Sequence, residues 1–480
     1  MTVMAAAVCV AACSAGPCGN EPARAGQTLP LGTSASLNGL LTSTLLFAAA
    51  DTDKDGLVVR DELRAATGAW FMEADAAQAG AVTREQLEPV LDAALPLSSL
   101  AAAFNMGGTA AQPQTPEPAS VAAMTAALPA SAPARPASPR RVLVLARAAG
   151  FVHSSIPLAA ATIDALGQKT GAWTTTISYD AADVTAENLR QFDAVFLAST
   201  TGAFLDDPAD AAATAARRRA LLEFVRGGKG LAGIHAATDA YHEDSAPPAA
   251  GGGIADLFKS FSAGGTLASL MLAQGDSNSD ERLDRAEVEA LADAWYRTLD
   301  PDGAGRLTQA DFALFGTLVP PSPAAAAQQG PDTQVGTWAD YNRMIGGFFK
   351  YHWLDPQLVT VRIDDPTSPL TAMFDGQSFD IRDEIYTMAA DSWSRDNVRV
   401  LTSIDYDRMS EGDRALEDYP RADRDYGLSW IRREGEGRVF YLALGHSERI
   451  YANTPMLEHV LAGMQYALGD LQADDTPVPR

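Results

Sequence analysis

The stretch Lys229–Asp239 constrains the fold of this chain more than any other. It reads KGLAGIHAATD, in which Leu231–Ile234 is a short apolar run that follows a glycine. Such a run is typical of a strand buried on both faces of a parallel sheet. The polar residues His235, Thr238 and Asp239 follow it directly. Because open parallel sheets bind their ligands just beyond the carboxyl ends of the strands, this stretch predicts both a sheet and the position of its site.

Strand and helix patterns alternate on both sides of this stretch. Before it, we predict strands at 142–146, 174–179 and 194–198 and helices at 156–166, 186–191 and 207–226. After it, we predict a helix at 338–352, strands at 358–363 and 398–404, a hairpin of 428–432 with 439–444, and a closing helix at 456–468. This order predicts an α/β domain, built from 140–245 and 335–470, whose mainly parallel sheet is flanked by helices.

Residues 51–62 match the twelve-residue calcium loop of an EF-hand. The predicted ligands are Asp51, Asp53, Asp55, the carbonyl of Leu57 and Glu62. Gly56 stands at the sharp turn, and Val58 is the apolar residue that pairs with a sister loop. Calcium is a hard cation that takes several oxygen ligands, which accounts for carboxylates at this spacing. We therefore predict that Ca²⁺ binds here, and the alternative is an acidic turn between two helices.

Three further loops share this frame. The loop 75–86 starts 24 residues after the first and keeps Gly80, but Ala77, Ala79 and Gln86 replace ligands, so we predict a structural partner without metal. The loops 276–287 and 300–311 are again 24 residues apart. Their predicted ligands are Asp276, Asn278, Asp280, the carbonyl of Arg282 and Glu287 in one, and Asp300, Asp302, the carbonyl of Arg306 and Asp311 in the other. As predicted calcium sites we rank these two loops second and third, after 51–62, because Glu281 and Ala304 depart from the EF-hand pattern.

The four loops predict two all-α EF-hand pairs, at 36–100 and 254–318. The second pair is an insertion in the α/β domain, between Pro-rich and Gly- or Ala-rich stretches at 246–253 and 319–334, and we expect it to be an autonomous lobe. The short spacing within each pair favours a single connecting helix, and with it stable calcium binding over switching. Residues 101–139, dominated by Ala, Pro, Ser, Thr and Gln, are predicted to be a linker.

Charge and cysteine positions limit the partners and the location. Among 480 residues, 61 are acidic and 36 basic, and the net charge of −25 argues against nucleic acid and anionic membranes as partners. All cysteines (Cys9, Cys13 and Cys18) lie in a leader at 1–18, where Val10–Cys13 is similar to a bacterial lipoprotein signal without its usual basic residues. We predict an exported protein of the periplasm or cell envelope, lipid-anchored at Cys13 and lacking a transmembrane span.

The histidines mark where chemistry is expected. His153, His235 and His446 each follow a predicted strand, and His352 ends a predicted helix. Each alone is readily explained as a structural histidine of a turn, but as a set they predict one shared site. We expect His153, His235, His352 and His446 to converge there with Asp239 and Glu384 nearby, as acid/base groups or as ligands of a divalent metal such as Zn²⁺. His242 and His459 are predicted to be structural.

The same residues carry a family resemblance. The motifs are FVHSSI at 151–156, LASTTG at 197–202, GIHAATD at 233–239, FKYH at 349–352, DEIY at 383–386 and ALGH at 443–446. Together they resemble the ThuA-like (trehalose utilisation) family over about 140–250 and 335–470. The resemblance implies a class I glutamine amidotransferase-like, flavodoxin-like fold and a role in carbohydrate metabolism. Since the predicted domain has no cysteine and His235 takes the nucleophile position, glutaminase chemistry is excluded. The family pattern has a tryptophan where Ile385 stands, so we expect no sugar stacking there.

Two classes of function remain open. The first is an enzyme that acts on a sugar or sugar derivative, of hydrolase, lyase or isomerase type, through His, Asp and Glu side chains. The second is a non-catalytic, calcium-stabilised envelope module that binds glycans or proteins. The expected partner is a small carbohydrate or a glycan, and the sequence leaves the oligomeric state open.

Overall fold

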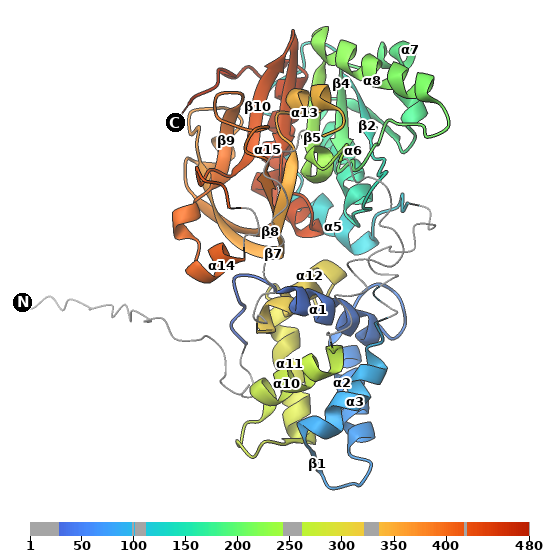
Figure 1. The fold of residues 1–480 in the computed structure, drawn as a ribbon, viewed down its shortest axis with the longest axis vertical. Coiled ribbons are helices and arrows are strands. Elements are labelled where there is room, and N and C mark those ends of the chain that lie inside the picture. The colour runs from blue at the N-terminus through green and yellow to red at the C-terminus, as the bar shows by residue number, and fades with distance from the viewer. Residues whose placement is uncertain are drawn as a thin grey trace, which may run out of the picture.

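The chain forms a sheet domain and a helical lobe, which lie one above the other in Figure 1. The computed structural model describes residues 28–97, 100, 112–242, 262–320, 336–416 and 420–479. The predicted leader 1–18, with the proposed lipid-anchored Cys13, lies outside the described residues, as do 101–111 and most of the two stretches that flank the insertion. No helix in the described ranges combines the length and the apolar character that crossing a bilayer requires.

One mixed sheet forms the core of the upper domain, with nine strands among the described residues in the order β3-β2-β4-β5-β11-β10-β9-β7-β8. The first five, which are parallel, are β3 (Thr174–Ser178), β2 (Arg141–Leu145), β4 (Ala194–Ala198), β5 (Gly230–Ile234) and β11 (Gly437–Leu442). The other four run antiparallel to their neighbours: β10 (Gly427–Glu434), β9 (Arg399–Ile404), β7 (Phe349–Ile363) and β8 (Phe379–Met388). The predicted parallel sheet thus accounts for one half, and an antiparallel half extends it.

Helices cover the parallel half from both sides. On one face, α6 (Ile156–Thr170) lies against β2, β3 and β4, α15 (Thr454–Ala467) lies against β5 and β11, and η7 (Glu448–Ala452) lies between them. On the other, α8 (Ala211–Arg226) and α13 (Ala339–Ile345) contact β11, and α7 (Ala186–Leu189) contacts α8. Right-handed crossovers place α6 and α8 on opposite faces, because the chain leaves β2 and β4 in opposite directions along the sheet. The remaining short elements are η1 (Ala181–Asp183), η2 (His235–Thr238), η5 (Ala372–Phe374), η6 (Tyr406–Arg408) and α14 (Glu411–Ala415).

Two predictions in this domain are wrong. The helix predicted at 338–352 ends at Ile345, because Gly346 adopts a left-handed conformation (φ +93°) and stops it, so His352 lies on β7. The linker predicted at 101–139 is packed structure where it is described. There α5 (Pro118–Ala127) contacts α6 and η7, and its Met124 is buried in the core of the sheet domain.

The helical lobe is built from both predicted calcium-loop segments. The first supplies α1 (Leu37–Ala50), α2 (Arg60–Ala74), β1 (Ala81–Val82) and α3 (Arg84–Ala94). The second supplies α10 (Ala263–Gly275), β6 (Leu283–Asp284), α11 (Arg285–Leu299), α12 (Gln309–Ala313) and η4 (Leu314–Leu318). As predicted, one helix joins the two loops of each segment.

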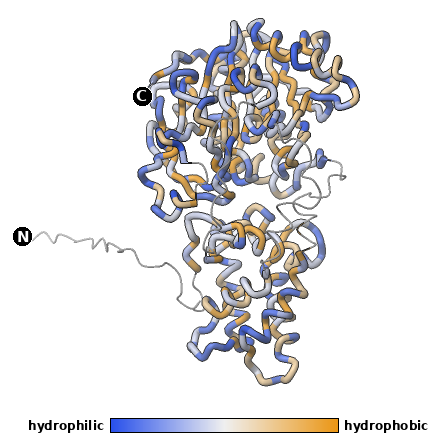
Figure 2. Tube along the Cα trace, in the orientation of Figure 1, coloured by the Kyte–Doolittle hydropathy of each residue, from blue (hydrophilic) through white to orange (hydrophobic). Residues whose placement is uncertain are grey.

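The expectation that each segment pairs its own two loops is wrong. Val82 of loop 75–86 pairs with Leu283 of loop 276–287, and Val58 of loop 51–62 pairs with Leu307 of loop 300–311. A single apolar core contains buried side chains of both segments, and Figure 2 shows hydrophobic stretches along the chain of the lobe. The insertion is therefore not autonomous, because half of its core comes from the N-terminal segment.

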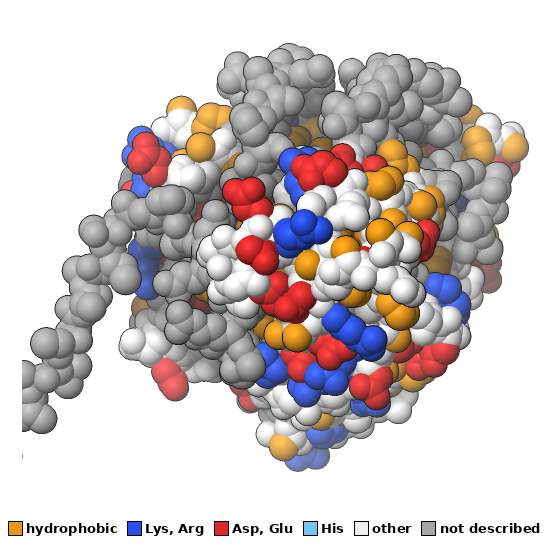
Figure 3. All heavy atoms as spheres, turned by 90° about the horizontal axis from the view of Figure 1, so that it is seen from below, with side chains coloured by type: hydrophobic (Ala, Val, Ile, Leu, Met, Phe, Trp, Pro, Cys, Tyr) orange, Lys and Arg blue, Asp and Glu red, His pale blue; other side chains and the backbone are white. Residues whose placement is uncertain are grey.

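The lobe also contacts the sheet domain, with α1 and α12 on the side that faces it (Figure 1). The strand residue Leu358 donates its backbone N–H to the carbonyl of Thr33 at 2.7 Å, and Arg382 donates to the carbonyl of Gly32 at 2.8 Å. Arg449, in η7, donates to the carbonyl of Ala310 in α12. At the opposite end of the molecule, acidic, basic and apolar side chains are interspersed on the surface of the lobe (Figure 3).

Candidate active site

A ribbon of β7 and β8 brings the carboxylate of the site to the parallel strands. β7 pairs with β9 only over Val361–Ile363, whereas its pairing with β8 continues from Val361 back to Phe349. This ribbon therefore extends beyond the rest of the sheet. It reaches the carboxyl end of β5, where the Tyr386 hydroxyl lies 3.2 Å from Nε2 of His235.

His235 occupies a strained turn directly after β5. Its φ of +48° lies in the left-handed region, which a non-glycine residue adopts at a cost and mostly at functional positions. The Tyr441 hydroxyl, 2.8 Å from the Thr238 hydroxyl, donates to the carbonyl of His235 at 2.6 Å and holds the turn. Nδ1 of His235 lies 2.9 Å from the carbonyl oxygen of Ala443, which can only accept, so Nδ1 carries the proton. Nε2 is then left with a lone pair that faces the site.

Four side chains converge at this point. His153, His235, Glu384 and His446 each offer a ligand atom, and these atoms all lie within 4.8 Å of one another. The three imidazole rings contact one another edge to face, with centroids 4.8 to 5.3 Å apart. Nδ1 of the buried His153 has no hydrogen-bond partner among the described residues. We call these four residues the histidine cluster.

His352 lies beside the histidine cluster, on its solvent-exposed side. Its Nδ1 lies 3.2 Å from Oε1 of Glu384, whose Oε2 is 3.4 Å from Nε2 of His235. The side chains of His352 and His446 are 26% and 28% exposed, so solvent reaches the cluster from their side.

The charges of the cluster follow from burial and from its own members. Burial raises the pKa of Glu384, but the imidazoles of His352, His446 and His235 outweigh it and lower that pKa well below its usual value. Burial and the neighbouring imidazoles hold the pKa of His153 far below its ordinary range. Burial lowers the pKa of His446, but the nearby carboxylates, Glu384 first, raise it above the ordinary value. The site thus combines an anionic carboxylate with a buried neutral imidazole.

Asp383 anchors the loop that carries His446. Its carboxylate accepts backbone N–H groups of Gly445, His446 and Ser447 at 2.6, 3.3 and 2.9 Å. Burial, with the nearby Asp355, raises the pKa of Asp383 to about 6. Asp355, Asp383 and His446 also lie close enough for metal binding. However, the Asp383 carboxylate is engaged by the backbone donors, and Asp355 pairs with Arg449 at 2.6 Å.

The remaining predicted residues lie at the margin or in the core. Asp239 is not among the four converging side chains, and its carboxylate lies 2.7 Å from Nε2 of His242. His459, predicted to be structural, is buried and contacts the carbonyl of Leu370 and the hydroxyl of Ser429. Ile385 is fully buried and pairs with Trp353 across the ribbon, so stacking was never available at that position. The prediction missed Asp383 and Tyr386, although both stand in the DEIY motif beside Glu384.

The four twelve-residue loops share one backbone geometry. Positions four and six of every loop have positive φ angles: Lys54 and Gly56, Gln78 and Gly80, Ser279 and Glu281, Gly303 and Gly305. In loop 51–62 the carboxylates of Asp51, Asp53 and Asp55 offer oxygens within 4.8 Å of one another. Loop 276–287 adopts the same shape with Glu281, at φ +62°, in the position that glycine usually takes.

The carboxylate at position twelve is held in the same way in loops 51–62 and 276–287. Glu62 accepts the backbone N–H groups of Thr52 and Val59, both at 3.0 Å, and Glu287 accepts those of Ser277 and Asp284 at 2.9 and 3.0 Å. In loop 300–311 the shorter Asp311 accepts only from Thr308, through its N–H and its hydroxyl.

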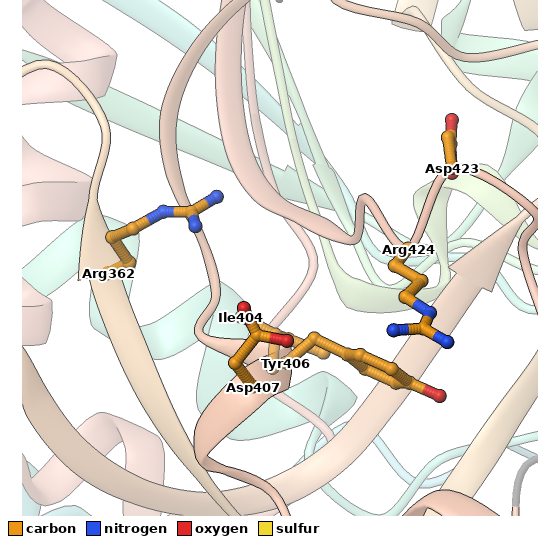
Figure 4. A pocket seen from close by; sticks show the side chains of 6 residues that line it. All are labelled: Arg362, Ile404, Tyr406, Asp407, Asp423 and Arg424. Carbon is orange, nitrogen blue, oxygen red and sulfur yellow. The ribbon is translucent and has the colours of Figure 1, made fainter.

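Figure 4 shows a cavity of about 250 Å³ that the histidine cluster does not line. Its lining is Arg362, Ile404, Tyr406, Asp407, Asp423 and Arg424. Arg362 and His352 are ten residues apart on β7, which corresponds to about 30 Å of strand. Arg362 is engaged by the hydroxyl of Ser403 and by Asp364. We therefore place the chemistry at the histidine cluster.

The fold and the cluster define an α/β protein with a histidine–carboxylate site at the carboxyl ends of its parallel strands. The model of the family described as trehalose utilisation (ThuA) matches residues 141–329 and 323–467, well over half of the chain. The chain belongs to this family, which indicates a sugar-related role.

Two solved structures are similar to the chain. A protein described as ThuA-like from Bacteroides uniformis ATCC 8492 is 14% identical, with a TM-score of 0.41, 71% of this chain covered and 97% of that one. Another from Parabacteroides merdae ATCC 43184 is 13% identical, with a TM-score of 0.36, 70% of this chain covered and 93% of that one. A comparison with curated proteins gave no match.

Proposed function

We propose that this protein is an enzyme that acts on a sugar or sugar derivative, with a divalent transition metal held by His153, His235, His446 and Glu384. The observation that carries the proposal is the convergence of one ligand atom from each of these four side chains within 4.8 Å. Three imidazoles and a carboxylate are a donor set that suits Zn²⁺ and similar ions.

The surroundings of the cluster fit a metal ion. The His235 tautomer is fixed by the carbonyl of Ala443, which is how protein metal sites orient their imidazole ligands. The buried Nδ1 of His153 has no partner among the described residues, and its imidazole is neutral, as a metal ligand must be. Asp383 fixes the backbone at His446, so the ligands are positioned before the metal arrives.

The chemistry follows from the exposed side of the cluster. A bound divalent ion would polarise a carbonyl or hydroxyl of the sugar. His352, whose Nδ1 faces Glu384, would exchange a proton with the substrate at its Nε2. The Tyr386 hydroxyl, beside His235, would position a sugar oxygen. These roles support hydrolase, lyase or isomerase chemistry and involve no thiol.

Metal content and turnover test the proposal together. The full chain is stripped with chelator, reconstituted with Zn²⁺ and compared with Glu384→Gln, His235→Ala and the control His242→Gln, which lies outside the cluster. We expect one equivalent of metal in the wild type and control, at least tenfold weaker binding in the two cluster variants, and loss of turnover on intact or oxidised disaccharides. Equal metal binding by all four proteins would overturn the metal site. Retention on polysaccharide without turnover would favour the non-catalytic binding module instead.

We further propose that the helical lobe is an EF-hand assembly that binds Ca²⁺, most tightly at 51–62. The shared backbone geometry of the loops and the converging carboxylates of Asp51, Asp53 and Asp55 support this. Loop 51–62 is paired with loop 300–311, and loop 276–287 is paired with loop 75–86. Calcium at 51–62 or at 276–287 would therefore stabilise helices of both segments. Calorimetric titration of the full chain should show a tighter site that Glu62→Gln removes, and an unchanged titration in that variant would contradict the assignment.

A further inference from the structure

Phe151 is an exposed aromatic side chain beside the histidine cluster that the proposed chemistry does not use. It is 49% exposed, among the most exposed large apolar side chains in the described part of the chain. Its ring contacts that of His153 edge to face, with centroids 4.8 Å apart. It therefore stands next to a buried member of the cluster and presents apolar surface to solvent. An exposed aromatic ring beside a candidate site is available to contact a ligand there.

The backbone holds Phe151 in place. The hydroxyl of Thr201 donates to the carbonyl of Phe151 at 2.7 Å, and the N–H of Gly150 donates to the same hydroxyl at 3.2 Å. Ala149 donates its N–H to the carbonyl of Thr201 at 2.9 Å, so the loop after β2 is fastened to the loop after β4. A ring on an anchored loop costs little entropy to use as a binding surface.

Polar side chains near the ring can bind the hydroxyls of a ligand. Ser154, three residues after Phe151, donates to Glu448 at 2.8 Å, and Glu384 lies in the cluster itself. A saccharide in contact with Phe151 would therefore find hydrogen-bond partners for its hydroxyls.

We propose that Phe151 is the stacking platform for the ring of a saccharide that reaches the histidine cluster. The inference rests on the proposed function and adds to it a residue that binds the substrate. The apolar C–H face of a pyranose packs on the aromatic ring, while its hydroxyls face the cluster and the Ser154–Glu448 pair. Stacking at Phe151 also supplies the aromatic contact that the buried Ile385 cannot make.

The test is saccharide binding by the full-length protein and two variants. Trehalose, maltose and cellobiose are titrated by calorimetry. We expect Phe151→Ala to weaken binding of the preferred disaccharide by about tenfold, which is what a stacking contact contributes, and Phe151→Trp to stay within about threefold of the wild type.

Two results would overturn the inference: equal affinity of Phe151→Ala and wild type, or no binding of any of the three disaccharides to the wild type. Circular dichroism and metal content of each variant are measured on the same samples. Phe151 touches only the edge of the cluster, so both should match the wild type. Absence of metal from wild type with a retained Phe151 effect would contradict the proposed function but not the platform.

Discussion

His459, a buried histidine outside the histidine cluster, should make the stability of the sheet domain depend on pH. His459, on α15, is fully buried. Its Nδ1 lies 2.6 Å from the carbonyl of Leu370, and its Nε2 lies 2.9 Å from the hydroxyl of Ser429, which in turn contacts Thr402 at 2.7 Å. The neutral imidazole satisfies every partner, donating to the carbonyl and accepting from the hydroxyl. Burial lowers the pKa of His459 to about 4 from its ordinary 6.5.

The sign and size of the effect follow from linkage. Because the folded-state pKa lies below the unfolded one, the unfolded chain takes up the proton first as the pH falls. The stabilisation is complete above pH 6.5, declines between pH 6.5 and 4, and is lost below pH 4. A difference of 2.5 pKa units corresponds to about 3 kcal/mol of unfolding free energy.

Denaturant unfolding at pH 7, 5.5 and 4.5 measures this dependence, with His459→Gln as the comparator. Glutamine can donate to Leu370 and accept from Ser429 but does not titrate. All tryptophans except Trp70 and Trp295 belong to the sheet domain, so fluorescence reports mainly on its unfolding. Carboxylates titrate in both proteins, and the difference between the two profiles isolates the histidine. Parallel profiles for wild type and variant would refute the reasoning.

Further predictions concern the helical lobe and its contact with the sheet domain. Leu283 is buried in the β-bridge between the two segments, so Leu283→Ala should destabilise the lobe by about 3 kcal/mol, as measured by calorimetry. The control Met72→Ala, at an exposed position, should change the unfolding free energy little. Equal effects of the two substitutions would contradict the shared core. Glu281→Gly should relieve a left-handed conformation worth about 1 kcal/mol and tighten calcium binding at 276–287, and weaker binding would argue against that site. Arg449→Met leaves the carboxylate of Asp355 without its cation, so the sheet domain should lose about 3 kcal/mol, and an unchanged unfolding midpoint would show that the ion pair contributes little.

Much of the parallel half of the sheet could be predicted from the sequence. The strand predicted at 194–198 has those bounds in the structure, and β5 differs from its prediction by one residue. Strands buried on both faces leave an unambiguous apolar run. Because such strands end at one edge, the convergence of His153, His235 and His446 could be predicted without knowing any distance. Asp239, expected near the cluster, lies close to His242 in the sequence and pairs with it.

The arrangement of the helical lobe could not be predicted in this way. Val58, Val82, Leu283 and Leu307 occupy the same position in four loops of the same frame, so the sequence allows any pairing among them. Only the shared core decides it. The end of α13 at Gly346 could not be predicted either, because the apolar pattern of the helix continues past Gly346 into β7.

Anomalous diffraction at the zinc absorption edge, from crystals of the full chain reconstituted with Zn²⁺, would locate the metal proposed at the histidine cluster. We expect a peak about 2.0 to 2.2 Å from one ligand atom each of His153, His235, His446 and Glu384. Crystals of Glu384→Gln grown in the same way should show a weaker peak at that position. No peak at the cluster in the wild-type protein, with stoichiometric zinc present, would contradict metal binding by these four side chains.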